Sequence, residues 1–108
     1  MAVVKQAIYS SLGDDPDFSE LVELYVAEMP ERIQRFKQLF DHGDYFELNR
    51  FAHQLKGSAG GYGFIEITPA AARVEHAATD DPDLAELEAA LSELLELCGR
   101  VRSGETAR

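Results

Sequence analysis

Apolar residues recur at the spacing of an α-helix through most of this 108-residue chain. One run follows Pro16, others precede Gly43 and Gly60, and the last follows Pro82. Positions three and four apart share one face of a helix, so each run can bury one face and leave the other in water. The last run has the longest such face, made of Leu84, Leu87, Leu91, Leu94, Leu95, Cys98 and Val101.

Capping residues divide these runs into separate helices. The tetrapeptide Asp-Asp-Pro-Asp occurs at residues 14–17 and again at 80–83. An Asp N-cap, a Pro at the first helical position and a further Asp near the positive end of the dipole all favour a helix start. Thr68-Pro69 indicates another start by the same reasoning, and Asp44 has capping-box-like spacing to Glu47. Pro30 interrupts the first long run, so either one helix bends there or two helices abut.

This pattern predicts an all-α protein, an antiparallel up-and-down four-helix bundle joined by short links. Residues 14–102 are expected to form the bundle. Residues 1–13 are a candidate for a short extra N-terminal helix, and residues 103–108 read as a frayed tail. Strand signals are nearly absent, because the one candidate, residues 63–68, is short and has no partner run.

Composition excludes several classes of function. Lys plus Arg number 10 and Asp plus Glu 20, so the net charge is −10, which disfavours binding to nucleic acids and anionic membranes. No apolar run approaches the roughly 20 residues that span a bilayer, and the N-terminus lacks the pattern of a secretory signal. The single cysteine, Cys98, cannot close an intrachain disulfide or build a multi-cysteine zinc site. A cytoplasmic domain is therefore expected.

The segment around His53 carries the strongest candidate for chemistry. On a helix, the core-facing sector contains Leu48, Phe51, Ala52, Leu55 and Ala59. His53 lies roughly 150° from the middle of that sector, so its imidazole is expected in solvent, where the neutral ring is a nucleophile near physiological pH. Lys56 follows three residues later and can place its ammonium beside an anion held on His53.

Gly57 lies inside the same helix and calls for an explanation. Glycine in a helix interior costs about 1 kcal/mol relative to alanine. Its bare backbone would let another protein approach His53, although it could equally serve close packing within the domain. A surface histidine near a lysine also arises by chance, so the pattern alone leaves a purely structural interpretation open.

The remaining polar candidates favour structural roles. His42 suits the negative end of a helix, and His76 is expected at the surface. Neither Glu-x-x-His nor His-x-x-x-His occurs, which disfavours a metal site in the bundle. Cys98 sits in an apolar stripe and is expected to be a buried thiol.

The string His53-Gln54-Leu55-Lys56-Gly57-Ser58-Ala59, followed by Gly63, closely resembles the signature of histidine-containing phosphotransfer (HPt) domains. These domains are helical bundles of multistep two-component phosphorelays. Met29-Pro30-Glu31-Arg32 looks like part of the preceding family helix, and Val74-Glu75 like a later family position. The resemblance covers residues 14–100.

The resemblance implies a role for each matching residue. His53 would carry the phosphoryl group as phosphohistidine, and Lys56 would stabilise the negative charge of the phosphate. Gly57 would leave room for the partner. Glu75 would accept a hydrogen bond from the other imidazole nitrogen and so fix the tautomer and orientation of the ring.

The resemblance also implies partners. The donor and acceptor would be aspartates of receiver domains, in a response regulator or a hybrid histidine kinase, and Mg²⁺ would be bound by the receiver. The docking face would include Phe46, Asn49, Arg50 and Gly60, although Phe46 could instead be buried against the N-terminal segment. No phosphate-binding glycine loop occurs, so we expect a phosphoryl carrier with no ATP site and no cofactor of its own.

Two alternatives stay open from the sequence. The chain could be a helical adaptor that docks a receiver or kinase without being phosphorylated. It could also be the HPt domain of a larger hybrid histidine kinase. An intact His53, Lys56 and Gly57 favours a phosphoryl carrier over the adaptor.

Overall fold

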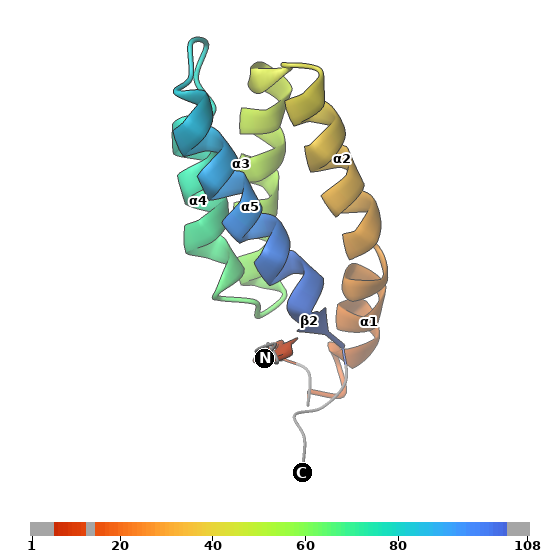
Figure 1. Ribbon diagram of the computed structural model, residues 1–108. Coiled ribbons are helices and arrows are strands. Elements are labelled where there is room, and N and C mark those ends of the chain that lie inside the picture. The colour runs from red at the N-terminus through yellow and green to blue at the C-terminus, as the bar shows by residue number, and fades with distance from the viewer. Residues whose placement is uncertain (1–5, 13–14, 104–108) are drawn as a thin grey trace, which may run out of the picture.

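The computed structural model describes residues 6–12 and 15–103. Over these residues the elements are β1 (Ile8–Tyr9), α1 (Ser19–Ala27), α2 (Met29–Asp41), α3 (Tyr45–Gly61), α4 (Ile67–Ala77), α5 (Leu84–Arg100) and β2 (Val101–Arg102). Helices α2 to α5 form an antiparallel four-helix bundle, and α1 extends the α2 arm at one end (Figure 1). The fold class predicted from the sequence is confirmed. Within the described ranges, no helix is long and apolar enough to cross a membrane.

The first arm of the bundle consists of two helices that abut at Glu28. Pro30 has no N–H, so the helical hydrogen bond that its nitrogen would donate is missing. The Arg32 side chain spans this junction, because its Nη1 donates to the Tyr25 carbonyl at 2.9 Å. Its guanidinium also lies 4.2 Å from the centre of the Tyr25 ring. Of the two arrangements left open by Pro30, the structure therefore has the two abutting helices.

Two aspartates cap helices, Asp44 at the position predicted from the sequence and Asp83 two residues later than the Asp81 cap that Asp-Asp-Pro-Asp predicts, since α5 begins at Leu84. The Asp44 carboxylate accepts from the Glu47 backbone N–H at 3.2 Å, and the Asp83 carboxylate accepts from the Glu86 N–H at 3.1 Å. The start expected near Pro16 is displaced, because residues 16–18 form turns and α1 begins at Ser19. Helix α4 begins close to its expected position, with Pro69 in its first turn, where a missing N–H costs nothing.

The core lies between the inner faces of the helices. Four of the five core-facing residues predicted on α3 are buried, and Phe51 is half-buried with its ring centre 4.7 Å from that of Phe36. Leu84, predicted for the apolar face of α5, is the first residue of that helix and is 53% exposed. The largest side chains with almost no exposure are Phe36, Phe64, Met29, Leu48, Ile67, Leu87 and Leu94.

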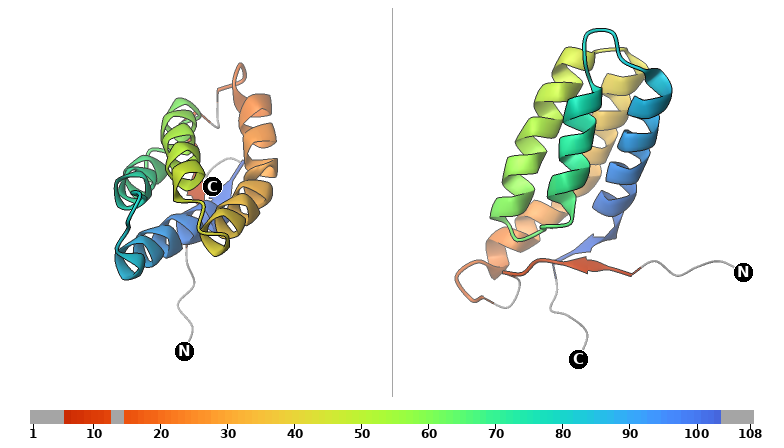
Figure 2. Two further views of the ribbon diagram at one scale, coloured as in Figure 1. Left: turned by 90° about the horizontal axis from the view of Figure 1, so that it is seen from above. Right: turned by 90° about the vertical axis from the view of Figure 1, so that its left-hand side faces the viewer.

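The candidate helix over residues 1–13 is wrong for the part that the structure describes, and residues 1–5 and 13 lie outside it. Residues Ile8–Tyr9 form β1, which pairs in parallel with β2 in the register Ile8 to Val101 and Tyr9 to Arg102. Both Ile8 and Val101 are buried, so the pairing completes the core at one pole of the bundle (Figure 2). The tail expected from residue 103 lies outside the described residues except for Ser103.

The turn between α3 and α4 is held by the N-terminal segment. Gly63 has φ of +85°, which other residues rarely adopt, and its carbonyl accepts from the Ser11 N–H at 2.9 Å. A Cβ at Gly63 would lie 2.5 Å from Ser10 Oγ, so the close approach also requires glycine. The strand considered over residues 63–68 does not form, because this turn leads directly into α4.

Candidate functional site

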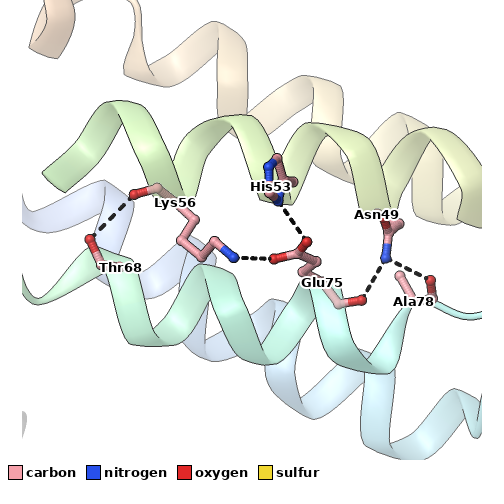
Figure 3. Close-up of polar contacts among 6 residues, drawn as sticks. All are labelled: Asn49, His53, Lys56, Thr68, Glu75 and Ala78. Atoms are coloured by element: carbon pink, nitrogen blue, oxygen red, sulfur yellow. Dashed lines mark hydrogen bonds and ion pairs between the residues drawn. The ribbon is translucent and has the colours of Figure 1, made fainter. Parts of the chain in front are cut away.

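Three side chains form a stripe along the face of α3 that lies over α4. Asn49, His53 and Lys56 are spaced by four and three residues, which places them on one side of a helix. All three hydrogen-bond to one residue of the neighbouring helix, Glu75 (Figure 3). Glu75 is therefore the centre of the site, with its carboxylate and its backbone bound to the same partner helix.

The imidazole of His53 is oriented by the Glu75 carboxylate. His53 Nδ1 lies 2.7 Å from Glu75 Oε2. A carboxylate can only accept, so Nδ1 carries the proton and the neutral ring has its lone pair on Nε2. The His53 side chain is 64% exposed, and among the described residues nothing hydrogen-bonds to Nε2. The nucleophilic nitrogen thus faces solvent from a ring whose orientation is fixed.

The Glu75 carboxylate is shared with Lys56. Lys56 Nζ donates to Glu75 Oε1 at 2.7 Å. The hydrogen bond from Lys56 and then that from His53 lower the pKa of Glu75, so the carboxylate is ionised at neutral pH. An ammonium has three N–H donors, so Lys56 can bind Glu75 and still donate to an anion placed on His53.

The surface beside His53 is open at Gly57. A Cβ built at Gly57 would meet nothing within 4 Å, so packing within the domain does not require glycine there. Gly60 differs, because a Cβ there would lie 3.3 Å from Thr68 Oγ1 on α4. The packing explanation considered from the sequence therefore fits Gly60 and not Gly57.

Phe46 and Arg50 lie on the exposed side of the first turns of α3. The Phe46 side chain is 68% exposed, so burial against the N-terminal segment is not what the structure shows. The Arg50 guanidinium lies 5.9 Å from the centre of the Phe46 ring and its Nη1 contacts Glu47 Oε1 at 2.9 Å. An exposed aromatic ring with a neighbouring guanidinium is typical of a surface that binds a partner.

Asn49 has a contact that sequence reasoning missed. It was expected on the docking face, but its Nδ2 donates to the backbone carbonyl of Glu75 at 2.7 Å and to that of Ala78 at 3.3 Å. Its position four residues before His53 was the available signal, since that spacing places both side chains over the same neighbouring helix.

The other polar candidates lie apart from this site. His42 is the C-cap residue of α2, and His76 is exposed on α4. Cys98 is buried in α5. Within the described ranges, no group of three or more His, Cys, Asp and Glu side chains is placed to hold a metal ion.

Comparison with known proteins identifies the family. The family model described as "Hpt domain" matches residues 20–104, which is most of the chain. The chain belongs to the Hpt domain family. No curated protein and no solved structure matches it. Hpt domains take part in histidine phosphotransfer in phosphorelays and interact with receiver domains. The resemblance drawn from the string around His53 is therefore confirmed at the level of the family.

Proposed function

We propose that this Hpt domain carries a phosphoryl group on Nε2 of His53 and exchanges it with aspartates of receiver domains. The observation that carries the proposal is the arrangement at Glu75. Its carboxylate holds the Nδ1 proton of an otherwise exposed imidazole at 2.7 Å, which leaves the Nε2 lone pair directed away from the bundle.

The transfer step follows from these atoms. The Nε2 lone pair attacks the phosphorus of an aspartyl phosphate, and the P–N bond forms as the P–O bond to the aspartate breaks. The bonding electron pair leaves with the aspartate carboxylate. His53 keeps its proton on Nδ1, and the positive charge that develops on the ring is stabilised by the Glu75 carboxylate. The reverse step returns the phosphoryl group to an aspartate.

Lys56 and Gly57 would serve the phosphate and the partner, respectively. The Lys56 ammonium is one helical turn from His53 and can donate to phosphate oxygens. Gly57 leaves the helix surface beside His53 without a side chain, so a receiver backbone can approach. Phe46 and Arg50 extend the same exposed surface by one to two turns of α3 and would contact the receiver.

The proposal is tested by incubating the domain with a panel of phosphorylated receivers. A phosphoramidate on histidine should be labile in acid and stable in base, and His53→Gln should abolish the label. The other two histidines provide matched controls, so His42→Gln and His76→Gln should be labelled normally. Label that persists in His53→Gln would refute the assignment. Receivers that bind without ever labelling the domain would support the adaptor instead.

A further inference from the structure

The C-terminal end of α4 has backbone carbonyls that the helix itself does not satisfy. The Ala78 N–H donates to the Val74 carbonyl at 2.9 Å and closes the last regular turn. The next N–H, that of Thr79, donates to Ala77 at 3.0 Å and not to Glu75. The carbonyls of Glu75 and Ala78 therefore need donors from outside the helix.

The amide of Asn49 supplies both donors. Its Nδ2 carries two hydrogens and lies 2.7 Å from the Glu75 carbonyl and 3.3 Å from that of Ala78 (Figure 3). Aspartate or leucine has nearly the same size but no N–H to offer. The side chain of Asn49 thus ties the end of α4 to α3 one helical turn before His53.

Glu75 is consequently fixed to α3 at three atoms. Its backbone oxygen is bound by Asn49, Oε2 by His53 and Oε1 by Lys56. If the end of α4 were free to move, the Glu75 carboxylate could accept from either ring N–H of His53 and would not select one tautomer. Fixing the backbone of Glu75 removes that freedom and leaves only side-chain rotation.

We propose that Asn49 is a positioning residue for the phosphotransfer site and acts through Glu75 on the tautomer of His53. This inference rests on the proposed function for its effect on phosphoryl transfer, but its effect on the His53 tautomer is independent of any partner. It gives Asn49 a role different from that of Arg50, the adjacent residue on the exposed surface.

The first experiment compares Asn49→Leu and Asn49→Asp with Arg50→Ala. Two-bond ¹H–¹⁵N spectra of ¹⁵N-labelled protein report which ring nitrogen of His53 carries the proton. Wild type and Arg50→Ala should show the Nδ1–H form, whereas both Asn49 variants should gain a population of Nε2–H. An unchanged His53 spectrum in both folded Asn49 variants would overturn the proposal.

The second experiment separates positioning from docking, with a receiver that labels the wild-type domain. Asn49→Leu should slow single-turnover transfer about tenfold, within the range by which groups that orient a histidine at metal sites affect activity, and receiver affinity should change less than twofold. Arg50→Ala should weaken binding with a near-normal transfer rate at saturation. A loss of affinity in Asn49→Leu with unchanged saturated rate would assign Asn49 to docking and refute positioning.

A measurement on the wild type covers the case in which the variants do not fold. The side-chain amide hydrogens of Asn49 should exchange with solvent more slowly than those of Gln54, which is exposed on the same helix. Equal exchange of the two amides would overturn the proposal. If no receiver labels the domain, the proposed function fails, while the tautomer spectra still decide the role of Asn49.

Discussion

Replacing Gly57 should make the domain more stable and less active at the same time. A Cβ at this position meets nothing within 4 Å, and the residue lies inside α3, four residues before its end. Alanine there gains the helix propensity that glycine lacks, about 1 kcal/mol, and meets no steric resistance. For a domain of this size that gain corresponds to a rise in Tm of about 4–8 °C. Thermal unfolding followed by circular dichroism measures it.

The larger variant Gly57→Gln separates stability from docking. Glutamine is also a good helix former, so its folding stability should rise similarly. Its side chain would occupy the space that the receiver backbone is proposed to enter, and affinity for the receiver should fall about tenfold, equivalent to about 1.4 kcal/mol. Titration calorimetry with a receiver that labels the wild type gives this value.

Gly99 on α5 provides the matched control. A Cβ there also meets nothing within 4 Å, and the position is exposed and on a different helix from His53. Gly99→Gln should therefore leave receiver affinity unchanged. If Gly57→Gln binds and accepts phosphate as well as Gly99→Gln does, the steric reasoning for Gly57 is refuted.

Three further outcomes follow from the site and the core. His53→Gln should unfold within about 0.5 kcal/mol of wild type by urea titration, because the side chain is 64% exposed, and a large loss would contradict its placement. The folded pKa of Glu75 lies below its usual 4.5, so the ionised carboxylate stabilises the folded state. This contribution is complete above about pH 4.5 and is lost as the pH falls through the lower folded pKa. The free energy of unfolding of Glu75→Gln, measured against pH, should therefore fall less steeply below pH 4.5 than that of the wild type. Burial raises the pKa of Cys98 from its usual 9.0 to about 12, which lowers the thiolate fraction at pH 8 about a thousandfold. A thiol reagent at pH 8 should therefore modify the native protein about a thousandfold more slowly than the urea-unfolded protein, and equal rates would place the thiol in solvent.

The helical part of the fold could be predicted because its signals are local. The cap formed by Asp44 and the apolar face of α5 are each encoded within one or two turns. The exposure of His53 followed from its angle to the apolar sector of the same helix. Its contact with Glu75 came from the resemblance, since the two residues are 22 positions apart on different helices and no spacing rule joins them.

The features that the sequence did not predict are created by tertiary contacts. The strand at Ile8–Tyr9 exists only because Val101–Arg102 lies beside it, and two residues are too few to show alternation. The apolar residues of the N-terminal segment therefore fitted a helix equally well. The hydrogen bonds of Asn49 could not be predicted, because its acceptors are backbone carbonyls on α4, which no side-chain pattern reveals.

The parallel pairing of β1 with β2 bears on the order in which the molecule assembles. Ile8 and Val101 are far apart along the chain, whereas α3 and α4 are joined by a turn of a few residues. Closing the longer loop costs more chain entropy and is compensated only after the helices have brought the end of α5 into place. We therefore expect the α3–α4 hairpin, which contains His53 and Glu75, to form early. The pairing of β1 with β2 should form last and open first.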